Sequence, residues 1–146
     1  MRLLAAGLLA ICLASAGCKA PYAPYDAGAP VHVIVTADPA PWKPVVIRPV
    51  ATLGPLVQKP PVLTMGGRGR PRGVEVALFT ATAGTHRLSV WEERTWTEAR
   101  ADIEVEGETW VVMEIERGKR EGRLRVYDAP PHEAVGSWQP LVAVPD

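Results

Sequence analysis

The chain has little of what small domains use to crosslink themselves or to cross a membrane. Its 146 residues include two cysteines, and no apolar run reaches the roughly 20 residues that a transmembrane helix needs. Cys12 lies inside a short apolar stretch near the N-terminus, so only Cys18 is left for the rest of the chain. No disulfide within a folded domain is therefore expected, and such a domain must be held together by core burial.

Side chains for covalent or metal chemistry are equally scarce. After residue 18 the only serines are Ser89 and Ser137, and neither lies in a Gly-x-Ser-x-Gly motif. The three histidines, His32, His86 and His132, form none of the closely spaced pairs that zinc sites use. The sequence predicts a protein that is not an enzyme and that holds neither a metal ion nor a cofactor.

The N-terminus has the three-part layout of an export signal. Met1-Arg2 provides a positive charge, residues 3–13 are uncharged and rich in leucine and alanine, and residues 14–17 are small. The apolar part is too short to span a bilayer. Residues 1–17 are therefore predicted to be a signal peptide that is removed after export.

Residues 15–18, Ser-Ala-Gly-Cys, resemble the lipobox of bacterial lipoproteins, whose cysteine carries a diacylglycerol. The resemblance implies that Cys18 is lipidated and that the lipid bilayer is a partner. Lys19 stands where an aspartate favours inner-membrane retention, which implies the outer membrane, with the protein facing the periplasm. The alternative is cleavage after Ala16, which gives a secreted or soluble periplasmic protein.

Proline and charge divide the rest of the chain. Eleven of the fifteen prolines fall between Pro21 and Pro71, and residues 18–30 are predicted to be a lipidated cysteine followed by an extended tether. Residues 19–73 carry a net charge of +5, and residues 74–146 carry −6. This arrangement favours scattered solvated charge; the alternative is a basic arm that packs on the acidic part or faces an anionic surface.

Period-two alternation of apolar and polar residues predicts strands in the acidic part of the chain. Val74, Val76 and Leu78 share one face of the first run. Further alternating runs cover residues 88–90, 95–106, 110–116 and 123–127, and additional strands are expected at 31–36, 45–50, 62–65 and 138–144. Turn signals recur about every ten residues. Residues 31–146 are therefore predicted to form one all-β domain, an antiparallel β-sandwich behind the Pro-rich tether, with no helix.

Residues 83–90 (Ala-Gly-Thr-His-Arg-Leu-Ser-Val) and 103–112 resemble the strand pattern of PEGA-type and related Ig-like or transthyretin-like accessory domains. Those domains are small β-sandwich modules of surface and envelope proteins, and most are not catalytic. The resemblance implies a sandwich fold and a packing role for His86.

A basic segment, Arg68-Gly69-Arg70-Pro71-Arg72, contains the Arg-Gly-Arg-Pro core of the AT-hook, which lies along the minor groove of DNA. An exported protein does not meet the chromosome, so no nucleic-acid partner is expected. The segment is predicted to be a flexible basic loop; the alternative is contact of Arg68, Arg70 and Arg72 with lipid phosphates or an acidic partner.

Five tryptophans are many for a chain with one phenylalanine. Trp96 and Trp110 fall on the predicted outer faces of strands joined by a turn at Gly107, which predicts a cross-strand aromatic pair. The pair is either covered by a second layer or exposed as a platform for sugar or protein. The leading hypothesis for function is a non-catalytic envelope lipoprotein that scaffolds or docks another envelope protein; the alternative is a glycan- or peptide-binding module.

Overall fold

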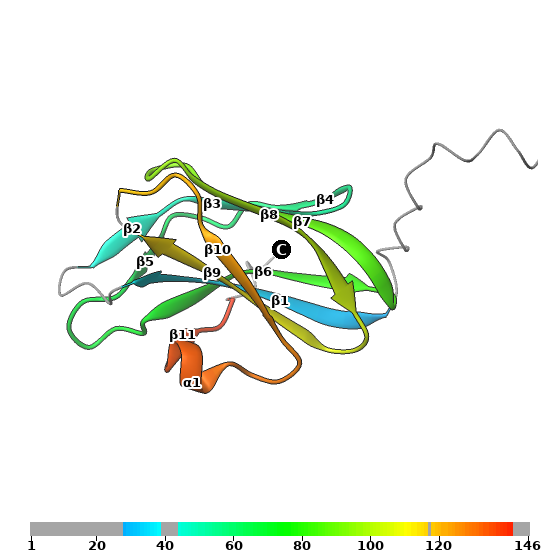
Figure 1. Ribbon diagram of the computed structural model, residues 1–146. Helices are drawn as coiled ribbons and strands as arrows, with labels where there is room; N and C mark the ends of the chain where they lie inside the picture. The colour runs from blue at the N-terminus through cyan, green and yellow to red at the C-terminus, as the bar shows by residue number, and fades with distance from the viewer. Residues whose placement is uncertain (1–27, 39–43, 117, 142–146) are drawn as a thin grey trace, which may run out of the picture.

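The structure is a computed structural model that describes residues 28–38, 44–116 and 118–141 (Figure 1). Residues 1–27 lie outside the described part, and with them the signal peptide, Cys18 and most of the predicted tether. Strands dominate, as the alternation predicts, and they form two larger sheets and one small one. Among the described residues, no helix is long and apolar enough to cross a bilayer.

The larger sheet has five strands in the order β10-β9-β1-β6-β11. These strands are Arg123–Tyr127, Thr109–Glu116, Ala29–Asp38, Gly73–Ala81 and Trp138–Gln139. The second sheet has the order β4-β3-β7-β8, with strands Leu56–Gln58, Pro49–Leu53, Gly84–Glu92 and Thr97–Val105. A two-stranded sheet pairs β2 (Val45–Ile47) with β5 (Leu63–Met65).

The two larger sheets lie in separate layers and enclose the main core (Figure 1). Alternate residues of each strand supply it, as expected for strands with one apolar face. The core is built mainly from small and medium aliphatic side chains, with two methionines and one phenylalanine; it includes Val33, Phe79, Leu88, Ile103 and Val111, all at most 2% exposed. Burial of this continuous core stabilises the domain without a disulfide.

The expectation of a purely antiparallel sandwich is wrong at two pairings. β1 pairs with β9 in parallel, and β11 pairs with β6 in parallel, so the five-stranded sheet is mixed. The turn at residues 106–108 accounts for the β1–β9 pair, because it passes from one sheet to the other and does not close a hairpin. Val105 and Val111 on either side of it both face the same core.

The predicted common face of Val74, Val76 and Leu78 is also wrong, because β6 contains a β-bulge. The partner of Val33 is Ala77 and the partner of Ile34 is Glu75, so Val76 is skipped in the pairing with β1. Both residues of the bulge, at 76 and 77, face the core, and the alternation is reversed beyond them. Leu78 is consequently 42% exposed, whereas Phe79 is 2% exposed.

A short helix, α1 (His132–Val135), lies against the outer face of the five-stranded sheet. Its four residues are too few for a helical period to show in the sequence. Val135 joins a second apolar cluster with Ile34, Trp110 and Val112, on which Trp138 packs. The strand expected at residues 138–144 is confirmed only for β11, and residues 142–146 lie outside the described part.

Deletion of residues 138–146 tests whether the C-terminal segment stabilises the domain. We expect the melting temperature to fall by several degrees, because the deletion removes the Trp138 indole from the second cluster and the 3.0 Å hydrogen bond from the Leu141 N–H to Glu75. Trp138→Ala in the full chain should account for most of the loss. A melting temperature that stays unchanged would show that the segment contributes no stability.

Candidate functional site

The strands run between two ends of the sandwich, which we call the tether end and the distal end. Residue 28 enters β1 at the tether end, where the turns at 82–83 and 106–108 also lie. The distal end carries the segment 66–72 and the turns at 93–96 and 118–122. Because β1 has ten residues, the ends are about 30 Å apart at roughly 3.3 Å per residue.

Gly28 fixes the point at which the chain enters the sandwich. Its φ is +120°, in the region that favours glycine, and a Cβ there would lie 2.0 Å from the carbonyl oxygen of Ala81. Any tether before residue 28 therefore joins the domain beside the β6–β7 turn. The distal end is the part of the domain that lies farthest from this junction.

Two exposed tryptophans lie together at the distal end. Trp91, near the end of β7, is 42% exposed, and Trp96, in the β7–β8 turn, is 67% exposed. Their ring centroids are 6.1 Å apart and the planes are tilted by 44°, within the range of aromatic pairs. Large exposed aromatic surface of this kind marks interaction sites.

The β7–β8 turn is organised by the carboxylate of Glu92, which is completely buried. One oxygen accepts hydrogen bonds from the backbone N–H groups of Arg48 (2.7 Å) and Arg94 (3.1 Å). The other accepts from the N–H and the hydroxyl of Thr95, both at 2.6 Å. Burial alone would raise the pKa of Glu92, but these four hydrogen bonds outweigh it and the pKa is lowered.

Trp96 has a φ of +57°, and it is the only described residue other than glycine with a positive φ. A bulky side chain in this left-handed region costs about 1–2 kcal/mol, and glycine or asparagine would be expected there. Trp96 gains little burial in return, since it remains 67% exposed. Backbone strain that the fold does not need is a physical reason to look for function at this residue.

A shallow groove of about 550 Å³ starts at Trp96 and runs between the beginning of β8 and the β9–β10 turn. The side chains of Glu98, Arg100, Arg120 and Glu121 also line it. The backbone of Glu98 pairs with this turn, since its N–H donates to the Arg120 carbonyl at 2.8 Å and its carbonyl accepts from the Gly122 N–H at 2.9 Å. The groove therefore has an ordered floor. We call Trp91, Trp96 and this groove the docking surface.

The predicted pair of Trp96 and Trp110 does not form. Because the turn at 106–108 joins two different sheets, β9 lies beside β1 and not beside β8. Trp110 is 8% exposed and belongs to the cluster covered by Val135 and Trp138, so a second layer does cover it, formed by the C-terminal residues. Trp110 is consequently not part of an exposed platform, whereas Trp96 is exposed with a partner, Trp91, that the sequence reasoning missed.

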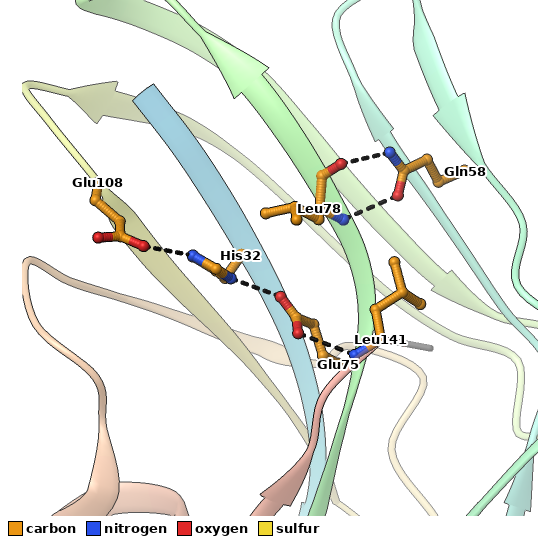
Figure 2. A network of polar contacts seen from close by, with 6 residues as sticks. All are labelled: His32, Gln58, Glu75, Leu78, Glu108 and Leu141. Atoms are coloured by element: carbon orange, nitrogen blue, oxygen red, sulfur yellow. Dashed lines mark hydrogen bonds and ion pairs between the residues drawn. The ribbon is translucent and has the colours of Figure 1, made fainter. Parts of the chain in front are cut away.

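Trp110 stacks on His32, with centroids 5.0 Å apart and planes 4° from parallel. Figure 2 shows His32 between two carboxylates: Nδ1 lies 2.6 Å from Glu75 Oε1, and Nε2 lies 2.8 Å from Glu108 Oε1. The second oxygen of Glu75 accepts from Leu141, so this network joins β1, β6, the 106–108 turn and the C-terminal segment.

His86 is completely buried in β7, in agreement with its expected packing role. Its Nε2 donates to the Thr82 carbonyl at 2.7 Å and so closes the β6–β7 turn. In the part of the chain that the structure describes, no three histidine, cysteine or carboxylate side chains are arranged to hold a metal ion.

Arg68, Arg70 and Arg72 are exposed at the distal end, and none of them forms an ion pair with a described carboxylate. The backbone of this segment is anchored, since Gly66 donates to the Pro71 carbonyl at 2.9 Å and Arg72 donates to the Ser137 carbonyl at 3.0 Å. The loop predicted from the sequence is thus present, and it lies at the same end of the sandwich as Trp91 and Trp96.

Comparison with known proteins finds no matching family, no matching curated protein and no matching solved structure.

Glu92→Gln tests whether the buried carboxylate organises the docking surface. We expect a loss of about 2 kcal/mol at neutral pH, or roughly 8 °C in melting temperature, because an amide cannot accept all four hydrogen bonds. The lowered pKa means that the carboxylate stabilises the fold above its usual value of about 4.5 and that this contribution is lost as pH falls below it. The difference between wild type and variant should therefore shrink in acid.

Glu93→Gln is the matched control for this experiment. Glu93 is the neighbouring residue, and its ion pair with Lys59, at 3.3 Å, lies at the surface. The substitution should change stability by less than about 1 kcal/mol. Equal losses in the two variants, or a Glu92→Gln difference that does not depend on pH, would contradict the role assigned to Glu92.

Proposed function

We propose that this protein is a non-catalytic lipoprotein of the bacterial cell envelope, anchored through Cys18, that docks a second envelope protein on the surface formed by Trp91, Trp96 and the adjoining groove. The observation that carries the proposal is Trp96, which is exposed and held at a backbone conformation unfavourable for tryptophan. Tryptophan and arginine are the side chains most enriched at protein-binding hot spots, and both occur here.

The arrangement of the two ends supports a docking role. A chain anchored at Cys18 would reach the domain at Gly28, and the docking surface lies at the opposite end of the strands. Residues 19–27 would span up to about 30 Å if extended. An anchored domain of this shape can present Trp91 and Trp96 to a partner beyond the lipid headgroups. Outer-membrane location, facing the periplasm, follows from the lipobox resemblance and from Lys19.

Kinship with PEGA-type, Ig-like or transthyretin-like accessory domains is part of the same proposal. The β-sandwich and the buried His86 support it. The parallel β1–β9 pair differs from a purely antiparallel module, so the proposed kinship concerns the β-sandwich architecture and not the detailed strand pairing.

Glycan binding is a second candidate function for the same surface. A tryptophan face beside carboxylates and guanidinium groups offers a sugar ring both apolar contact and hydrogen bonds. Protein docking is favoured because Trp91 and Trp96 are tilted by 44° and do not form one flat platform.

Cys18→Ala tests the anchor. The wild type should incorporate labelled palmitate and sediment with membranes, because several acyl chains hold a protein on a bilayer essentially permanently. The variant should lose the label and either become soluble after cleavage at Ala16 or remain as precursor. A wild type that is soluble and unlabelled would show that Ala14-Ser15-Ala16 is the cleavage site and that the protein is not a lipoprotein.

Docking is tested in cells with a photoreactive amino acid at Glu121, an exposed residue of the groove, and at Val126, an exposed residue of β10, as the control. We expect a protein crosslink from position 121 and none from 126. Adding Trp96→Gly should abolish it while leaving the free energy of unfolding unchanged or raised by up to about 1 kcal/mol, because glycine relieves the strain. A crosslink that survives Trp96→Gly, or none at 121, would contradict protein docking; a glycan adduct at 121 would favour the second candidate.

A further inference from the structure

Arginine side chains without an ion-pair partner collect at the distal end. Six guanidinium groups there, those of Arg48, Arg68, Arg70, Arg72, Arg94 and Arg120, are exposed and pair with no carboxylate in the described part of the chain. Arg94 lies in the turn that carries Trp96, and Arg120 lines the groove beside it. Free guanidinium groups therefore lie close to the exposed indoles.

Most carboxylates of the same end are already engaged. Glu92 is buried among backbone N–H groups, Glu93 pairs with Lys59, and Glu98 pairs with Arg100 at 2.6 Å. Glu116 pairs with Lys119 at 2.7 Å. Glu121 is the exposed carboxylate of the groove without an ion pair among the described residues. The two lysines that the structure describes at this end, Lys59 and Lys119, are paired, whereas the unpaired cations described there are arginines.

The tether end has the opposite character. A second groove there, of about 700 Å³, is lined by the carboxylates of Glu104, Glu106, Glu108 and Asp128. The sandwich is thus polarised along its strands, acidic where the chain enters and basic at the docking surface. A partner that meets the distal end meets positive potential, which attracts and orients an acidic surface.

We infer that the segment recognised by the docking surface is acidic: an apolar or aromatic side chain packs on Trp91 and Trp96, and flanking aspartate or glutamate carboxylates bind Arg94 and Arg120. This inference rests on the proposed docking function and names the chemistry of the partner. The planar guanidinium fork binds a carboxylate through two parallel N–H···O bonds, which a lysine cannot provide. The tryptophan supplies the desolvated centre, and the arginines supply the polar rim.

Peptide binding to the mature lipoprotein in nanodiscs of zwitterionic lipid tests the inference. The probe is Asp-Glu-Phe-Glu-Asp, and its matched control is Asn-Gln-Phe-Gln-Asn, which keeps the aromatic side chain and removes the carboxylates. Tryptophan fluorescence reports binding, because Trp91 and Trp96 are exposed. We expect the acidic peptide to bind at least about tenfold more tightly than the control, with an affinity that falls as salt is raised.

Arg94→Gln and Arg120→Gln should each remove most of this preference for the acidic peptide, while leaving the melting temperature unchanged. Arg125→Gln on β10, whose guanidinium faces Glu114 at 4.0 Å, is the control and should leave binding intact. Equal affinity for the two peptides, or no binding of the acidic peptide up to about 5 mM, would overturn the inference. Binding of vesicles with anionic lipid in place of the acidic peptide would overturn it in favour of a lipid surface.

The outcome is separable from that of the docking function. A Trp96-dependent crosslink at position 121, together with failure of the acidic peptide, refutes an acidic partner and leaves protein docking intact. No crosslink at position 121 in the otherwise unchanged protein, or a crosslink that survives Trp96→Gly, refutes docking itself.

Discussion

A single buried carboxylate, that of Glu92, determines the shape of the distal end. One oxygen accepts from the N–H groups of Arg48 and Arg94 and the other accepts from Thr95, so the residue before β3 and the β7–β8 turn are held to one point. A carboxylate without these donors could not remain ionised in a buried site. The turn holds the backbone of Trp96 in a left-handed conformation that places its side chain in solvent. In that position the indole of Trp96 packs beside that of Trp91.

At Trp96 the conformation that exposes the side chain to solvent lowers the stability of the fold. The turn needs a left-handed residue at that position, and glycine or asparagine would satisfy it with less strain. The fold tolerates tryptophan at this position because the backbone is fixed on both sides of it. Glu92 holds Thr95 before it, and Thr97 after it pairs with β7. Strain kept by the rest of a rigid structure is characteristic of binding surfaces, where a side chain is positioned before the partner arrives and loses little freedom on binding.

The alternation of apolar and polar residues was sufficient to locate the strands, but it did not show which strands pair with one another. Alternation located β7, β8 and β9 correctly, because one face of each packs on the core. It could not show that the turn at 106–108 connects strands of two different sheets, since hairpins and connections between sheets use the same turn residues. For that reason the burial of Trp110 was not predicted. The bulge at Val76 likewise has no local signature and moved Leu78 to the surface. Trp91 lies near the end of β7 and Trp96 in the turn that joins it to β8, so treating these two consecutive strands as a hairpin would have brought the two tryptophans together.

The two ends of the sandwich acquire opposite characters because β1 and β6 are antiparallel. This pairing sets the segment 66–72 and the β7–β8 turn at one end and the junction at Gly28 at the other. The sequence is basic before residue 73 and acidic after it, but the two ends of the sandwich do not correspond fully to these two parts. Arg94 and Arg120 come from the acidic part and still lie at the basic end. What decides the potential of each end is which charges find partners there. At the distal end most of the described carboxylates are paired or buried, whereas six of the arginines pair with no described carboxylate, so a surface of mixed composition acts as a cationic one.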